Sequence, residues 1–272
     1  MPVPLEAGRP HGSGISGLGK RGHIVVREIF FVAGLLSAAT AIPSNAMAQN
    51  GFGGSLQLFS GTGDAAWVAG EDGATEWLDD GYRFTGSDSS GGWNVNWDML
   101  GASGVNDSIT LNFTVTNLSS TTQTFFLFAT QEIDALESTL AGGSIAGSFT
   151  DLNGDGVTVS SVAGDSIFTG FYDATAFDPF DGTVIATLLD DTTASAGSFL
   201  SGNYDAAAFG DFPVIPGQVA GSVDFNFGIG LRFDVSAGDT AAFTSSMAVG
   251  VPGPGALALM GLAGMHRRRR RD

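Results

Sequence analysis

The sequence contains no cysteine, and its long central part also lacks lysine and histidine. The single lysine is at position 20, and the three histidines lie at positions 11, 23 and 266 of 272 residues. The absence of cysteine excludes disulfides and thiolate metal sites. Without histidine, cysteine or lysine, the central part offers no Ser-His-Asp triad, thiol nucleophile, Schiff base or imidazole ligand. Most hydrolase mechanisms are therefore excluded for this region.

Positive charge is also scarce in the central part. Of the 11 basic residues, four precede residue 49, five form the run 267–271, and only Arg83 and Arg232 lie between. Residues 49–250 hold 25 of the 28 acidic side chains against these two arginines, a net charge of −23. Such a surface repels the phosphate backbone of nucleic acids and attracts divalent cations. We therefore predict no nucleic-acid partner.

The N-terminal segment has the order of a secretory signal: a positive region, an apolar run and a small-residue cleavage site. These parts are Lys20, Arg21 and Arg27, then residues 29–42, then Ala46-Met47-Ala48. The apolar run has 14 residues, fewer than the about 20 that cross a bilayer, which favours cleavage over a permanent anchor. We predict a signal helix, the secretion translocon as a partner, and a mature chain that begins at Gln49. The glycine- and proline-rich first 20 residues are an extension or follow a misplaced start codon.

The last 22 residues also have three parts. They are Val251, Pro252, Gly253, Pro254 and Gly255, then the apolar residues 256–265, then His266 with Arg267, Arg268, Arg269, Arg270 and Arg271. Proline cannot donate to a sheet ladder, so the two prolines end the preceding strand. A helix over the apolar part extends about 15 Å, roughly half of a bilayer core. The arginines would hold this end on the cytoplasmic side.

This tail resembles the PEP-CTERM sorting signal of bacteria, in which a short Val-Pro-Glu-Pro-like motif precedes a hydrophobic helix and an arginine cluster. Gly253 stands where that family usually has glutamate. The resemblance implies an exosortase-type membrane protease as a partner, which cuts near Pro252 to Pro254. It also implies export, transient anchoring in the inner membrane and a final location at the cell surface or outside the cell. The alternative is a plain tail anchor.

A period of two dominates the central part. Residues 223–235 are apolar at seven successive odd positions, which predicts a strand with one buried face. Gly228 and Gly230 predict a bulge or bend in its middle. Residues 236–239 are typical of a turn, so we predict a hairpin with a following strand that extends to Met247.

A second unit of this kind has an alternating strand at 109–116, a turn at 117–120 and a strand at 121–130. The four adjacent apolar residues 125–128 predict burial on both faces of that strand. Shorter strands are predicted at 55–59, 82–85, 93–97, 157–162, 166–172 and 183–189, and a short helix at 132–140. We therefore predict an all-β fold: an antiparallel β-sandwich or jelly-roll-like body over 49–250, between a signal segment (1–48) and a sorting tail with a short hydrophobic helix (251–272).

One segment matches the opening of a calcium loop. In the sequence 151–156, Asp-Leu-Asn-Gly-Asp-Gly, side-chain oxygens of Asp151, Asn153 and Asp155 could converge on the ion. The twelfth loop position, where a bidentate glutamate is expected, is Val162. The alternative is a β-turn rich in Asp, Asn and Gly. Calcium is the one candidate cofactor of the chain.

The spacing of two tryptophans also bears on function. Trp93 and Trp97 lie four residues apart, so on one strand both would face the same side, as sugar-stacking platforms do; the alternative is core packing. The first reading predicts a carbohydrate-binding module with extracellular polysaccharide as its partner.

Carboxylate chemistry remains open to the central part, and glycoside cleavage by two acids is the obvious case. The candidate carboxylates are Glu71, Glu76, Glu132, Glu137, Asp178 and Asp181. No spacing selects two of them to face one another. We therefore predict a non-enzymatic, exported protein of the cell surface or extracellular matrix, with the carbohydrate-binding module as the first alternative and a carboxylate glycosidase as the second.

Overall fold

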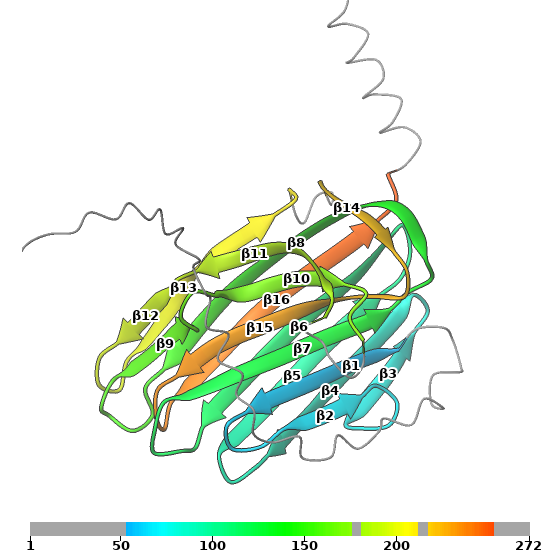
Figure 1. Ribbon diagram of the computed structural model, residues 1–272. Coiled ribbons are helices and arrows are strands. Elements are labelled where there is room, and N and C mark those ends of the chain that lie inside the picture. Colours follow the sequence, from blue (N-terminus) through cyan, green and yellow to red (C-terminus); the bar gives the residue numbers. More distant parts are fainter. Residues whose placement is uncertain (1–52, 176–180, 212–216, 253–272) are drawn as a thin grey trace, which may run out of the picture. The chain divides into compact units, whose positions relative to one another are not determined.

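The computed structural model describes residues 53–175, 181–211 and 217–252, and the regular structure in these ranges is all β-strand. The strands form two antiparallel sheets of 8 strands each (Figure 1). No helix in these ranges is long and apolar enough to cross a membrane. The predicted signal helix and C-terminal helix lie outside the described residues. The all-β prediction is confirmed.

The first sheet has the order β11-β10-β15-β7-β1-β2, with β9 also paired to β15 and β12 paired to β9. Its strands are β1 (Gly54–Ser60), β2 (Ala65–Val68), β7 (Gln123–Glu132), β9 (Val157–Ser161), β10 (Ser166–Tyr172), β11 (Thr183–Asp190), β12 (Thr193–Ala196) and β15 (Asn226–Val235).

The second sheet has the order β13-β8-β16-β6-β5-β4-β3, with β14 also paired to β8. Its strands are β3 (Ala74–Leu78), β4 (Gly81–Ser89), β5 (Trp93–Ala102), β6 (Asn106–Asn117), β8 (Leu136–Thr150), β13 (Ser201–Phe209), β14 (Gln218–Val223) and β16 (Thr240–Gly250).

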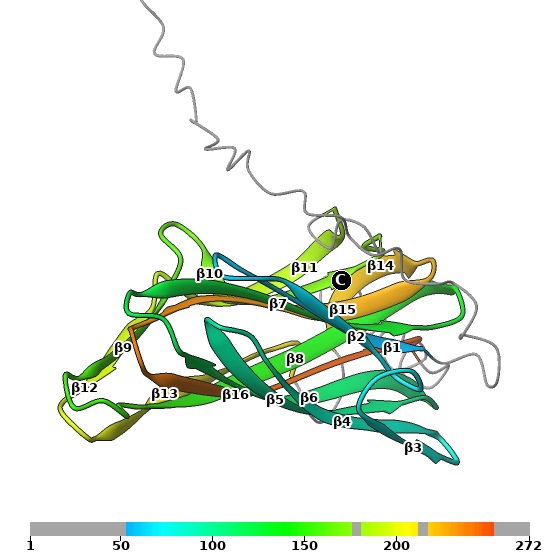
Figure 2. The same cartoon turned by 90° about the horizontal axis from the view of Figure 1, so that it is seen from below.

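The two sheets lie as layers over a shared core, as Figure 2 shows. Alternating side chains of the central strands, such as β5 and β6, point into this core and are buried. The rings of Phe233 on β15 and Phe243 on β16 meet there, with their centroids 4.6 Å apart. This arrangement is consistent with the predicted β-sandwich.

The two predicted hairpins are wrong in their pairing. β15 and β16 follow one another in the chain, but β15 pairs with β7, β9 and β10, whereas β16 pairs with β6 and β8. β6 and β7 are likewise in different sheets. Each turn therefore carries the chain from one sheet to the other. The alternating pattern predicts one buried face, but it does not tell whether the next strand pairs in the same sheet or lies across the core in the opposite sheet.

Two further predictions are corrected. The helix predicted at 132–140 is absent, because β8 begins at Leu136 and pairs with β14 and β16; this pairing overrides local helix propensity. The run 223–235 breaks at residues 224–225, between β14 and β15, and its glycines lie within the regular ladder of β15. Gly228 leaves room for the Phe171 ring, which would lie 2.6 Å from a Cβ at that position.

The prediction of burial on both faces is confirmed for β7. This strand lies between β15 and β1. Phe125 and Leu127 are fully buried on the core side. Phe128 is buried against Phe171, with the ring centroids 6.0 Å apart.

Candidate cation site at the Asp151 turn

Three carboxylates gather where two turns meet. Asp151 and Asp155 belong to the turn after β8, and Asp239 ends the turn between β15 and β16. One carboxylate oxygen of each lies within 4.8 Å of the others. Asp151 and Asp239 are buried and Asp155 is exposed. The structure thus brings two of the three predicted ligands together and adds Asp239, which sequence reasoning missed.

The Asp151 carboxylate accepts hydrogen bonds from four backbone N–H groups. Its Oδ1 accepts from the N–H groups of Asn153 and Gly154 at 3.2 and 2.9 Å. Its Oδ2 accepts from the N–H groups of Gly156 and Phe199 at 3.2 and 2.5 Å. A carboxylate offers about four lone-pair positions, so these bonds use all of them. Asp151 therefore fixes the turn and joins it to the segment before β13.

Asn153 is also used by the protein itself. Its Oδ1 accepts from the N–H of Asp155 at 3.0 Å, and its Nδ2 donates to the carbonyl of Ala237 at 2.8 Å. The second bond ties the Asp151 turn to the turn between β15 and β16. The Asn153 side-chain oxygen is thus engaged within its own turn by the Asp155 N–H.

The two buried carboxyl groups have pKa values shifted in opposite directions. Burial acts to raise the pKa of Asp151, but the four backbone hydrogen bonds outweigh it, and the net shift is downward. Burial raises the pKa of Asp239; the hydrogen bonds from Ser236 and Leu152 oppose this, and the nearby Asp151 adds to it. Asp239 accepts from the Ser236 hydroxyl and from the Leu152 N–H. The surroundings therefore favour the charged form of Asp151 and the neutral, protonated form of Asp239.

The oxygen chemistry suits a hard cation such as calcium, which takes six to eight oxygen ligands. Only Asp155 and Asp239 keep unused lone pairs, however, because Asp151 is filled by backbone donors. The contacts of Asp151 and Asn153 are those of a turn held by its own hydrogen bonds, the alternative that the sequence offered. The pattern Ser236-Ala237-Gly238-Asp239 is the signal that could have pointed to Asp239 as part of a second turn.

The sugar-stacking role predicted for the tryptophans is contradicted, and the alternative, core packing, is confirmed. Trp93 and Trp97 face the same side of β5, as expected, but that side is the core, and their exposed fractions are 2% and 4%. Both pack on Trp67, with ring centroids 6.3 and 4.5 Å away. Buried indole faces cannot stack on a sugar ring, so the two tryptophans are core residues.

The candidate catalytic carboxylates are not gathered in a described site. Glu71, Glu76, Glu137 and Asp181 are exposed, Glu132 is half-buried, and Asp178 lies outside the described residues. The Asp181 carboxylate accepts from the backbone N–H and hydroxyl of Thr175, at 2.8 and 3.0 Å. None of the five described acids belongs to the carboxylate cluster.

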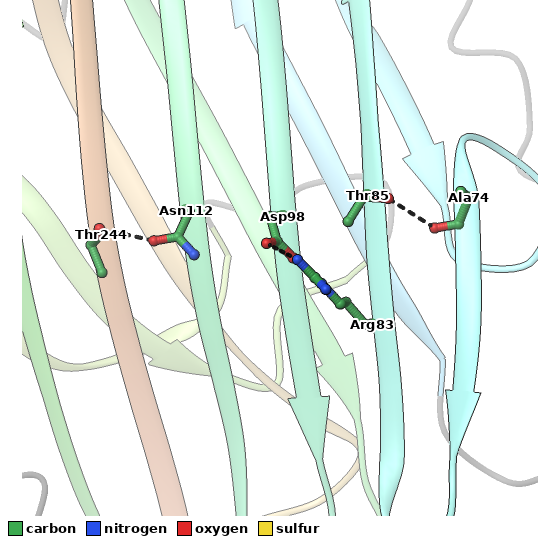
Figure 3. Close-up of polar contacts among 6 residues, drawn as sticks. All are labelled: Ala74, Arg83, Thr85, Asp98, Asn112 and Thr244. Atoms are coloured by element: carbon green, nitrogen blue, oxygen red, sulfur yellow. Dashed lines mark hydrogen bonds and ion pairs between the residues drawn. The ribbon is translucent and has the colours of Figure 1, made fainter.

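A shallow depression of about 470 Å³ lies on the outer face of the second sheet, where β6, β16, β8 and β13 run side by side. Its outward side chains are amides, hydroxyls and methyl groups: Asn112, Thr114, Ala146, Ser148, Asn203, Ala242 and Thr244. No acidic or basic residue lines it. Figure 3 shows part of this face, including the hydrogen bond from Thr244 to Asn112 at 2.9 Å. Sequence reasoning missed it, because each of these residues is an ordinary outward position of a strand.

The predicted processing residues lie largely beyond the described ranges. Val251 and Pro252 follow the last residue of β16, and Val251 is exposed. The others are outside the described residues: Ala46, Ala48, Gln49, Gly253, Pro254, Gly255 and Arg267 to Arg271.

No family model matches the chain, and no curated protein matches it. One solved structure that shares weak similarity is described as the structure of infectious bursal disease virus Gx strain, at 14% identity and a TM-score of 0.24. The alignment covers 74% of this chain and 51% of the viral chain. The chain therefore spans about half the length of that protein, and the likeness carries no argument about function.

Proposed function

We propose that the chain is an exported, non-enzymatic protein of the cell surface or extracellular matrix, sorted and processed through its C-terminal tail. The observation that carries the proposal is the three-part tail 251–272, which follows the last strand of the body directly. The signal-like segment before Gln49 supports export, since it has the order of a secretory signal. The finer fold that we propose for 49–250 is a jelly-roll-like sandwich.

The attachment of the tail suits removal by an exosortase-type membrane protease. β16 is paired on both sides up to Gly250, with Asn106 of β6 and Leu140 of β8 as its last partners. A cut near Pro252 to Pro254 removes no residue of this ladder. The folded body would therefore leave the membrane with its sheets whole.

A carbohydrate-binding module is the second candidate function. The uncharged, hydroxyl- and amide-lined depression on the second sheet favours it, although the buried Trp93 and Trp97 do not contribute. Calcium, if bound at Asp155 and Asp239, would have a structural role, because it would neutralise carboxylates at a turn.

The test of the main proposal is cell fractionation with intact-mass analysis of the native protein. We expect a released species that begins at Gln49 and ends near Pro252. Replacing Arg267 to Arg271 by glutamine should leave the chain uncut, at a mass that includes the tail, because in the sorting signal that the tail resembles the arginine cluster is part of what the protease recognises. The control Arg9→Gln lies ahead of the signal and should be released normally. A wild-type chain that remains full-length in the cytosol or membrane contradicts the proposal.

A further inference from the structure

The depression on the second sheet arises from the order of side chains across the strands. In one row, Asn112 of β6 is paired with Thr244 of β16, which is paired with Ala146 of β8. In the adjacent row, Thr114 is paired with Ala242, which is paired with Ser148, and Ser148 with Asn203 of β13. Ala242 thus stands between the longer side chains of Thr114 and Ser148, and Ala146 lies beside Thr244 in the adjacent row. The methyl groups form the floor of the depression, and the amides and hydroxyls form its rim.

The rim offers hydrogen-bonding groups that the described protein does not use. Thr244 donates to the Oδ1 of Asn112, and Figure 3 shows the Asn112 amide nitrogen pointing away from that contact. Among the described residues, the Asn112 Nδ2 and the side chains of Thr114, Ser148 and Asn203 have no protein hydrogen-bond partner. Amides and hydroxyls together supply both donors and acceptors.

The lining of the depression is uncharged, although residues 49–250 carry a net charge of −23. In the row of Asn112, exposed Asp205 lies at one end, in the bulge of β13 opposite Ala146. At the other end, Asp98 of β5 is the cross-strand neighbour of Asn112. Its two oxygens accept from the Nε and NH2 groups of Arg83, at 2.9 and 2.8 Å, as Figure 3 shows. The arginine holds the pKa of Asp98 below its usual range, and the pair as a whole is uncharged. An anionic ligand gains no cation here and meets the acidic surface around it.

We propose that this depression binds a neutral polysaccharide that lies across β6, β16, β8 and β13. Sugar hydroxyl groups donate and accept, so they match the amides and hydroxyls of the rim, and the apolar faces of the sugar rings match the Ala146 and Ala242 methyl groups. The depression is open, which suits a chain that passes through it. No aromatic ring is presented outward there, so each sugar is held weakly and a long chain binds better than a short oligosaccharide. The proposal rests on the carbohydrate-binding candidate and is independent of tail processing.

The test is affinity electrophoresis of the purified full-length chain in native gels. Separate gels contain a neutral polysaccharide (dextran, galactomannan or hydroxyethyl cellulose), alginate as the polyanion, or no polysaccharide. We expect retardation in at least one neutral gel and none in alginate. Retardation in no neutral gel, or equal retardation in alginate, overturns the proposal. Neither result bears on export, which fractionation tests separately.

Three variants locate the site. Ala242→Glu fills the floor and adds a negative charge, so we expect at least a tenfold loss of apparent affinity. Asn203→Ala removes one amide and should weaken binding about 3- to 10-fold, the range of one hydrogen bond. Asn94→Ala removes an exposed amide of β5 that pairs with Thr116, away from the depression; it is the matched control and should bind as the wild type does. Unchanged binding by Asn203→Ala and by an Ala242→Glu protein of native thermal stability overturns the assignment. If Ala242→Glu does not fold, Asn203→Ala against Asn94→Ala decides alone.

Discussion

The substitution Asp239→Asn tests whether the carboxylate cluster is a turn held by hydrogen bonds or a calcium site, because it removes one negative charge. A unit charge on Asp239, within 4.8 Å of a neighbouring carboxylate, is repelled by at least about 3.5 kcal/mol at an effective dielectric constant of about 20. The amide of an asparagine keeps an oxygen for the Leu152 N–H, and its Nδ2 can donate to the Ser236 hydroxyl, which then donates to the Thr158 carbonyl. The hydrogen bonds are thus retained while the repulsion is lost. After allowance for solvent screening, we expect a stabilisation of about 1 to 3 kcal/mol at pH 7.

The pH dependence of stability gives a second measurement on the same variant. Because the pKa of Asp239 is raised in the folded state, the folded chain holds a proton that the unfolded chain has released. Stability therefore falls as the pH rises from the ordinary carboxyl range through the raised pKa, and Asp239→Asn removes this fall. Asp151, with its lowered pKa, acts in the opposite sense: its contribution is lost as the pH falls through that lowered value. Both trends can be read from urea unfolding between pH 3 and 8 (about 25 °C), fitted for the free energy of unfolding.

Thermal unfolding is measured in two series, one with a chelator and one with added calcium. In chelator, Asp239→Asn should unfold about 3 to 10 °C above the wild type, given about 2 to 4 °C per kcal/mol for a body of this size. Asp155→Asn is the matched control, and its gain should be smaller because the exposed Asp155 is screened by water. A lower stability of Asp239→Asn in chelator refutes the electrostatic argument. If calcium stabilises the wild type and not Asp239→Asn, the carboxylates ligate the ion; an identical wild-type transition in both series contradicts calcium binding.

Two further predictions concern residues that hold the strands in place. Asn117 is fully buried, and the two N–H groups of its Nδ2 are shared among the carbonyls of Thr121, Val235 and Ser236. Asn117→Asp should cost about 3 to 5 kcal/mol in urea unfolding, since both donors are lost and a buried anion meets three carbonyls; a cost below about 1 kcal/mol would contradict this argument. Gly228→Ala should cost about 1 to 3 kcal/mol, because its Cβ would lie 2.5 Å from the Ala129 carbonyl oxygen and 2.6 Å from the Phe171 ring. Gly61→Ala, which has open space around its Cβ, is the control, and equal effects of the two substitutions would contradict the packing argument.

Much of the strand content could be predicted from the sequence, whereas the pairing of strands could not. The strand predicted at 166–172 coincides with β10, and the one at 93–97 lies within β5. Alternation reports which residues are buried, and it is silent about whether the next strand lies beside them or across the core. The same limit explains Trp93 and Trp97: a period of two correctly placed both on one face, but only the opposite sheet decides that this face is the core.

The candidate site was partly predictable for a related reason. The Asp-Asn-Gly pattern at 151–156 correctly identified a turn in which Asp151 binds backbone groups, because such side chains satisfy N–H groups that no strand partner can reach. Asp239 is 88 residues further along the chain than Asp151, and only the meeting of the two turns relates them. The depression has no local signal, since its residues come from four strands and are individually unremarkable in sequence.

The chain crosses between the sheets where backbone groups leave the ladders, and buried polar side chains collect there for that reason. Asn117 ends β6 at one crossing, and its N–H donates to the carbonyl of Asp239 at the other, 2.8 Å away. Asp151 joins the same end through the Asn153 bond to Ala237. β16 begins at this end and extends for 11 residues, about 36 Å, to the residue before the tail. Cleavage of the tail and charge changes at the carboxylates therefore act at opposite ends of β16, and their effects on stability should add.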